Sequence, residues 1–117
     1  MKILLAEDER TISRLISQVL TAAGHEVNGV QSAADAIQSL RAGGYDLILL
    51  DLHLADGDGF QVVDSMEGGA GVNPPVVVMT GERSFAIDDP RAARVAGVLS
   101  KPFDLDELEA TVRSFVA

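Results

Sequence analysis

The chain has 117 residues, 47% of them hydrophobic, and no cysteine, so we expect one domain over residues 1–117 without disulfides, thiolate metal sites or cysteine nucleophiles. Its formal net charge of −9 argues against direct binding to nucleic acid or to an anionic membrane surface. No apolar stretch is long enough to span a bilayer and no signal peptide precedes the first strand, which predicts a cytoplasmic protein.

The first half of the chain alternates apolar runs with amphipathic segments. Lys2–Ala6 is a predicted strand, and Gly24 ends the helix that follows it. His25–Val30 is a weaker strand, Ser32 is the predicted N-cap of a second helix, and Tyr45–Leu50 is the most apolar strand. The apolar positions of the first helix recur at three- and four-residue spacing: Ile12, Leu15, Ile16, Val19, Leu20 and Ala23.

The second half continues the alternation. Leu52–Gly57 is a predicted loop, and Asp58 is expected to cap a third helix. Residues 81–89 show no clean period, and a short helix is predicted at Pro90–Ala96. Asp104 with Glu107 resembles a capping box that begins the last helix. The remaining strands are predicted at Val76–Met79 and Gly97–Ser100, and the predicted buried positions of the last helix are Leu105, Leu108, Val112 and Phe115.

Five strands that alternate with helices predict an α/β fold of the (βα)5 type. Short runs rich in Val, Ile and Leu are typical of parallel strands buried on both faces. Right-handed crossovers then place helices on both sides of a doubly wound, five-stranded parallel sheet. The flavodoxin-like strand order 2-1-3-4-5 puts the ligand-binding edge beside the first and third strands.

Chemically useful side chains stand at or just after the ends of four predicted strands. Glu7 and Asp8 follow the first, Asp51 the third, Thr80 the fourth and Lys101 the fifth. Parallel strands share an edge at their carboxyl ends, so these groups are expected to converge. Three carboxylates stay ionised together when a cation neutralises them, and an oxygen-only ligand set suits Mg²⁺. We therefore predict a divalent metal held by the three carboxylates.

Two of the remaining groups suit a phosphoryl ligand. Lys101 would place an ammonium beside the metal, and Thr80 would add a hydroxyl donor. The plainer alternatives are a solvated surface lysine and a β-branched residue at a strand end. Glu7, Asp8 and Glu9 form an acidic run at the start of the first helix, and the alternative for this run is a favourable interaction with the dipole of that helix. We prefer this alternative for Glu9 but not for Asp8.

In order and spacing, these motifs resemble the receiver domain of two-component response regulators, from residue 2 to about residue 116. The matching segments are KILLAED, LILLDLHLADGDGF, VVVMTG and KPF. The resemblance implies that Asp51 accepts a phosphoryl group from a phosphohistidine on a histidine kinase or a histidine phosphotransfer protein. It also implies that Lys101 and Thr80 contact that group. The implied Mg²⁺ ligands are Glu7, Asp8, Asp51 and the backbone carbonyl of His53, and the implied docking residues are Ile12, Leu15, Pro102 and Phe103.

Some positions depart from the family pattern. Val98 stands where an inward-rotating aromatic residue is usual, and three interpretations are open: replacement by Phe85, switching through loop ordering alone, or an altered output surface. We favour loop ordering. Asp56 and Gly57 predict a more mobile loop after the acceptor. The His53 side chain either faces the phosphoryl group or is an exposed loop histidine, and Leu15 and Phe103 are either docking residues or partly core.

The leading hypothesis is a phosphorylation-controlled signalling protein that switches the binding of a partner and is not an enzyme with a diffusible substrate. A metal-dependent phosphatase with an aspartyl-phosphate intermediate is the first alternative, but that class needs an Asp where this chain has His53. A pseudo-receiver that binds partners without phosphorylation is the second, and the complete set of acidic residues, Thr80 and Lys101 argues against it.

Overall fold

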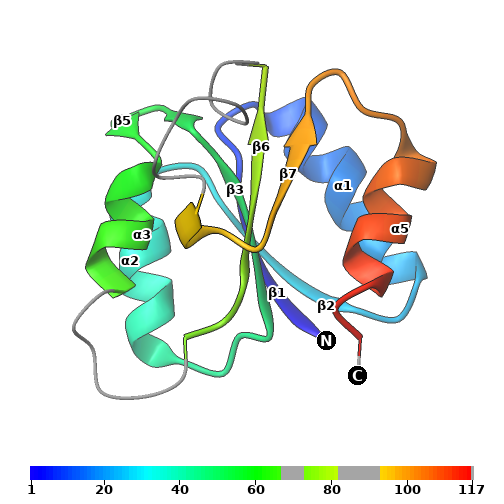
Figure 1. Cartoon of the computed structure of the whole chain (residues 1–117), viewed down its shortest axis with the longest axis horizontal. Coiled ribbons are helices and arrows are strands. Elements are labelled where there is room, and N and C mark those ends of the chain that lie inside the picture. The colour runs from blue at the N-terminus through cyan, green and yellow to red at the C-terminus, as the bar shows by residue number, and fades with distance from the viewer. Residues whose placement is uncertain (67–72, 82–92, 117) are drawn as a thin grey trace.

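The fold is organised around a five-stranded parallel sheet. The computed structural model describes residues 1–66, 73–81 and 93–116. The sheet has the order β2-β1-β3-β6-β7 with every neighbouring pair parallel (Figure 1). The predicted order 2-1-3-4-5 is therefore confirmed. The strands are β1 (Lys2–Ala6), β2 (Glu26–Val30), β3 (Leu47–Asp51), β6 (Val76–Thr80) and β7 (Gly97–Ser100).

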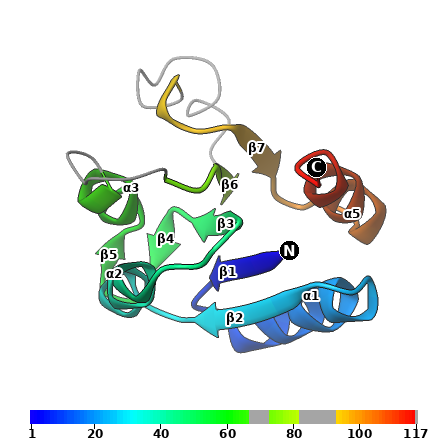
Figure 2. The same ribbon diagram turned by 90° about the horizontal axis from the view of Figure 1, so that it is seen from below.

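Helices cover both faces of this sheet, as predicted for a doubly wound fold. Helices α1 (Arg10–Ala22) and α5 (Leu105–Arg113) lie on one side, and α2 (Ala33–Ala42) and α3 (Phe60–Met66) lie on the other (Figures 1 and 2). The N-terminus lies at the end of the sheet opposite the carboxyl ends of the strands (Figure 1). No described helix combines the length and apolar character that crossing a membrane requires.

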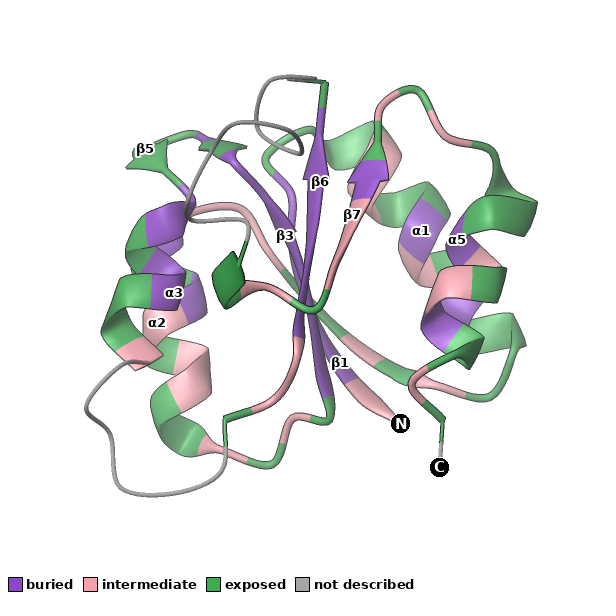
Figure 3. Ribbon diagram, in the orientation of Figure 1, coloured by how far each residue is buried: buried purple, intermediate pink, exposed green. Residues whose placement is uncertain are grey.

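The core consists of two apolar layers, one on each face of the sheet. Alternate residues of a strand point to opposite faces, so Ile3 and Leu5 pack with α1 and α5, while Leu4 and Ala6 pack with α2 and α3. All five residues of β3 and of β6 are buried (Figure 3). Burial on both faces explains why these strands are continuous apolar runs rather than alternating ones.

The helix ends follow the capping residues that the sequence indicates. The Ser32 Oγ accepts a hydrogen bond from the Asp35 N–H at 3.1 Å, and the Asp104 carboxylate accepts one from the Glu107 N–H at 2.7 Å. Each such cap contributes about 1 kcal/mol to helix stability. Gly24 follows Ala23, the C-cap of α1, and has a φ of +96°, a conformation that favours glycine.

The prediction of a loop at Leu52–Gly57 is wrong, because a short antiparallel hairpin forms there. Strands β4 (His53–Leu54) and β5 (Gly57–Asp58) pair directly after β3. The polar, glycine-rich composition favours a loop, but it is also typical of a tight turn between two-residue strands. The Asp58 carboxylate accepts a hydrogen bond from the Phe60 N–H at 2.9 Å, consistent with its predicted capping role.

Strand bounds differ from the prediction mainly at β3, which begins at Leu47 rather than Tyr45 and includes Asp51. The parallel register pairs Asp51 with Met79 of β6, so tertiary pairing extends the strand by one polar residue. Leu105, which was expected in the core, is 38% exposed, and Leu15, for which docking and core roles were both open, is 46% exposed. The apolar stripe of each helix is wider than the surface that the sheet and the neighbouring helix cover.

Two other predictions fall mostly outside the described residues. The expected helix Pro90–Ala96 and the irregular segment 81–89 are described only at 81 and 93–96, and Phe85 is not described. Val98 pairs with Val78 in the sheet and is partly buried against the layer beneath α2 and α3. The three interpretations of its role therefore stay open.

Candidate functional site

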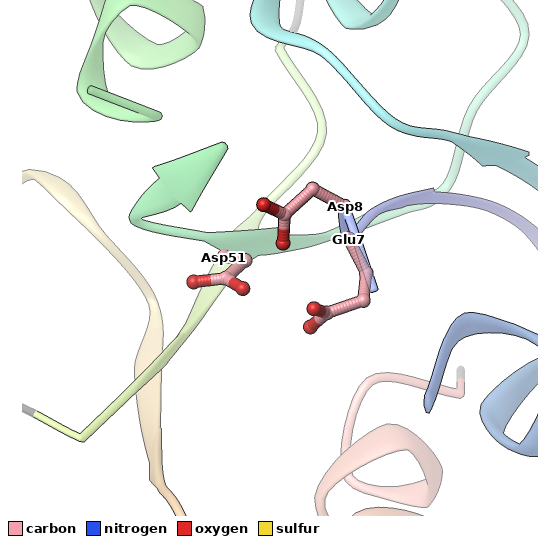
Figure 4. Close-up of side chains that lie close together, drawn as sticks. All are labelled: Glu7, Asp8 and Asp51. Atoms are coloured by element: carbon pink, nitrogen blue, oxygen red, sulfur yellow. The ribbon is translucent and has the colours of Figure 1, made fainter. Parts of the chain in front are cut away.

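Three carboxylates meet at the carboxyl ends of β1 and β3. The register places Ala6 beside Leu50, so Glu7 follows β1 next to the point where Asp51 ends β3. Asp8 is the next residue of the chain. Each side chain offers an oxygen within 4.8 Å of the others (Figure 4). Glu7 is 1% exposed and Asp51 is 5% exposed, whereas Asp8 is exposed to solvent, so the cluster is open on one side.

Lys101 brings a positive charge to this cluster from the end of β7. Its Nζ lies 2.9 Å from the Asp51 Oδ2 and 3.0 Å from the Glu7 Oε2. The Lys101 backbone N–H donates to the Thr80 carbonyl at 2.8 Å, which fixes the point where the side chain leaves the sheet. Burial lowers the pKa of Lys101, but its hydrogen bonds to Asp51 and Glu7 outweigh that effect and raise the pKa above its usual value. The lysine is therefore charged at neutral pH.

The same arrangement leaves Glu7 short of compensating charge. Burial raises the pKa of Glu7 to about 6, because desolvation and the neighbouring Asp51 outweigh the hydrogen bond from Lys101. Three ionised carboxylates and one ammonium leave a net charge of about −2 in a partly buried space, by simple addition. Hard oxygen donors, this residual charge and the open side at Asp8 fit a divalent cation such as Mg²⁺ that keeps part of its water shell.

Two further predicted residues border the acceptor carboxylate. Thr80 is 2% exposed and ends β6, the strand that pairs with β3 beside Asp51. The His53 backbone N–H donates to the Asp51 Oδ1 at 3.0 Å, and the His53 side chain is exposed. The two oxygens of Asp51 thus have different partners, an amide on Oδ1 and the ammonium of Lys101 on Oδ2.

The four predicted docking residues have different environments. Ile12 and Phe103 are partly buried and pack against the apolar layer beneath α1 and α5. Leu15 and Pro102 are exposed. For Phe103 the alternative of a partly core residue therefore agrees with the packing, whereas for Leu15 it does not. The peptide bond between Lys101 and Pro102 is cis.

Two residues near the acceptor, Gly59 and Asp56, were not among the predicted site residues. A Cβ built on Gly59 would collide with the Asp51 carbonyl oxygen and come within 3.2 Å of the Leu52 Cα. Asp56, expected in a mobile loop, instead accepts two backbone hydrogen bonds from the start of α2. The glycine-rich run around Gly57 is the one sequence signal at these positions, and by itself it indicates a turn without identifying its contacts.

Comparisons with known proteins agree with this geometry. Residues 3–113 match the family described as response regulator receiver domain. The swarming motility regulation protein RssB of Serratia marcescens is 36% identical over 115 residues, which are 97% of this chain and 52% of that protein. The transcriptional regulatory protein TcrA of Mycobacterium tuberculosis is 35% identical over 121 residues, which are 97% of this chain and 45% of that protein. The chain thus spans about half the length of these curated relatives.

Solved structures share the fold. The chemotaxis response regulator CheY4 of Vibrio cholerae superposes with a TM-score of 0.88 at 25% identity, covering 98% of both chains. The response regulator TrrA of Thermotoga maritima, solved in complex with Mg²⁺-BeF, superposes with a TM-score of 0.86 at 23% identity, also covering 98% of both chains. With a family match over residues 3–113 and an acidic pocket of Glu7, Asp8 and Asp51, this chain belongs to the receiver domains of two-component response regulators.

Proposed function

We propose that Asp51 is the phosphoacceptor of this receiver domain and that the donor is a phosphohistidine on a histidine kinase or a histidine phosphotransfer protein. The observation that carries the proposal is the position of the Asp51 carboxylate. It ends a buried strand, lies 2.9 Å from the Lys101 ammonium and has two further carboxylates beside it. The family is a class of phosphoacceptors rather than of classical enzymes.

The surrounding residues orient the acceptor and reduce electrostatic repulsion. The His53 N–H and the Lys101 ammonium hold the two Asp51 oxygens, which fixes the carboxylate before the donor arrives. The ammonium offsets negative charge as the phosphoryl group approaches, while a new O–P bond forms and the donor N–P bond breaks. The Thr80 hydroxyl is our proposed donor to a phosphoryl oxygen. Mg²⁺ bound by Glu7, Asp8, Asp51 and the His53 carbonyl would supply further charge neutralisation.

Phosphorylation would act as a switch because it changes the charge of a partly buried pocket. A phosphoryl group adds about −1.5 to −2 charge at neutral pH. Loops next to the pocket that have two arrangements would be biased by that charge, and a partner protein would bind one of the two. For the donor, we propose a docking surface that includes Ile12, Leu15, Pro102 and Phe103, of which Leu15 and Pro102 are the most accessible. We place this exchange in the cytoplasm.

Phosphorylation in vitro tests the acceptor assignment. The protein is incubated with MgCl2 and acetyl phosphate, and the added mass is located by peptide mapping. We expect the label on the peptide that contains Asp51 and no label on Asp51→Asn. Asp106→Asn is the matched control, since it removes one exposed carboxylate from the first turn of α5. Label that persists in Asp51→Asn would refute the assignment.

The same preparation distinguishes the alternative functions. Magnesium-dependent turnover of a small phosphate ester would indicate a phosphatase. Absence of any spectral response to beryllofluoride with Mg²⁺, together with absence of label, would indicate a pseudo-receiver.

A further inference from the structure

Asp56 links the hairpin after the acceptor to a helix that is distant in the sequence. It lies in the turn between β4 and β5, and its carboxylate oxygens accept hydrogen bonds from the N–H groups of Ala33 at 2.8 Å and Ala34 at 3.1 Å. These two residues are the first of α2. The contact therefore joins segments that are 22 and 23 residues apart.

The start of α2 depends on this carboxylate for its hydrogen bonds. The first N–H groups of a helix have no partner within the helix. Asp56 satisfies those of Ala33 and Ala34, and the Ser32 Oγ satisfies that of Asp35. Ala33 is completely buried, so water cannot easily replace the carboxylate there. The two backbone hydrogen bonds also lower the pKa of Asp56, and a negative charge at a helix N-terminus is favourable.

The other end of the hairpin is tied to the acceptor. His53 pairs with Asp58 across β4 and β5, and the Gly59 N–H donates to the Leu52 carbonyl at 2.8 Å. Within the same hairpin, the His53 N–H donates to the Asp51 Oδ1 at 3.0 Å. The hairpin is thus held at Asp51 by one amide and at α2 by one carboxylate.

We propose that Asp56 is a positioning residue for the acceptor site: by fixing the hairpin to the start of α2, it holds the His53 backbone against Asp51. The proposal rests on the proposed function, in which that backbone orients the acceptor through its N–H and offers its carbonyl to Mg²⁺. Loss of the carboxylate releases the turn of the hairpin while leaving every predicted ligand side chain in place. Asp56 therefore acts through His53 and does not touch the phosphoryl group.

Two variants of Asp56 and two matched controls test this role. Asp56→Ala removes both acceptors, and Asp56→Asn keeps one of them. Ser32→Ala weakens the same helix start without touching the hairpin, and Asp35→Ala removes one exposed carboxylate from its first turn. The readouts are the rate of labelling by acetyl phosphate, the Kd for MgCl2, and hydrogen exchange of the His53 amide.

We expect Asp56→Ala to weaken Mg²⁺ binding and slow labelling by about tenfold, the lower end of what second-layer contacts to metal ligands typically contribute. Asp56→Asn should show a smaller loss, and exchange at His53 should accelerate in the same order. Ser32→Ala and Asp35→Ala should match the wild-type protein in all three readouts, even where Ser32→Ala lowers the melting temperature.

Two results would overturn the positioning role. One is a Ser32→Ala variant that loses as much Mg²⁺ affinity and labelling as Asp56→Ala, since both would then report only helix stability. The other is unchanged exchange at His53 in Asp56→Ala. The exchange measurement does not depend on phosphorylation. Absence of label on wild-type protein, with His53 exchange still controlled by Asp56, would therefore refute the acceptor assignment alone.

Discussion

Replacement of Lys101 by methionine is the sharpest test of the electrostatics of the pocket. The substitution keeps an unbranched side chain of similar length and removes the ammonium that lies 2.9 Å from Asp51 and 3.0 Å from Glu7. Both carboxylates are almost fully buried, at 5% and 1% exposure. Without the lysine, two buried anions face each other with no cation, so metal-free protein should be destabilised.

The expected loss of unfolding free energy in Lys101→Met follows from these distances and exposures. At about 3 Å and an effective dielectric constant of about 20, each contact is worth roughly 5 kcal/mol before desolvation is subtracted. Removing one partner of a buried ion pair typically costs about 3–5 kcal/mol. The Lys101 side chain is 26% exposed, which favours the lower value, about 3 kcal/mol at pH 8. At roughly 4 °C per kcal/mol for a domain of this size, the melting temperature should fall by about 12 °C.

The assay is urea denaturation followed by circular dichroism, in EDTA and in excess MgCl2. The loss should be smaller in MgCl2, because the cation replaces the missing charge, and smaller at pH 5, where Glu7 takes up a proton. Adding Asp51→Asn to Lys101→Met should restore part of the stability. Lys2→Met is the matched control, since Lys2 is the other lysine of the sequence and lies over the Tyr45 ring. A Lys101→Met loss no larger than that of the control, or one unaffected by Mg²⁺, would refute the argument.

Three further predictions concern neighbouring residues. Gly59→Ala should lower the free energy of unfolding by about 1–3 kcal/mol and slow labelling by acetyl phosphate, because the added methyl group would displace the acceptor backbone. Gly81→Ala is the control, since its Cβ would meet nothing within 4 Å. It should change neither quantity in the same denaturation and labelling assays. In EDTA, the raised pKa of Glu7, about 6 against an ordinary 4.5, contributes stability that is fully present below pH 4.5 and lost as the pH rises through 6. The difference in unfolding free energy between wild type and Glu7→Gln should therefore change by about 2 kcal/mol across that window, and a flat difference would contradict the shift. Asp8→Ala should weaken Mg²⁺ binding by roughly tenfold or more in a fluorescence or calorimetric titration, since even second-layer partners contribute that much, whereas Glu9→Ala should leave the affinity unchanged.

The strands and their order could be predicted from the sequence because the relevant pattern is local. Residues 3–6 and 76–79 are apolar at every position, which is what burial on both faces of a parallel sheet requires. Right-handed crossovers then leave few topologies. The meeting of Glu7, Asp8 and Asp51 followed from the same rule, since parallel strands end at one edge of the sheet.

Other features depend on contacts between distant segments and were decided by the tertiary structure. The composition around Asp56 is typical of a loop, and its partners Ala33 and Ala34 lie 22 and 23 residues earlier, where no pattern in the sequence indicates a carboxylate. The exposure of Leu15 depends on how much of α1 the sheet and α5 cover, which helical spacing cannot give. The raised pKa of Glu7 likewise comes from burial beside Asp51 and Lys101, an environment that exists only after the strands have assembled.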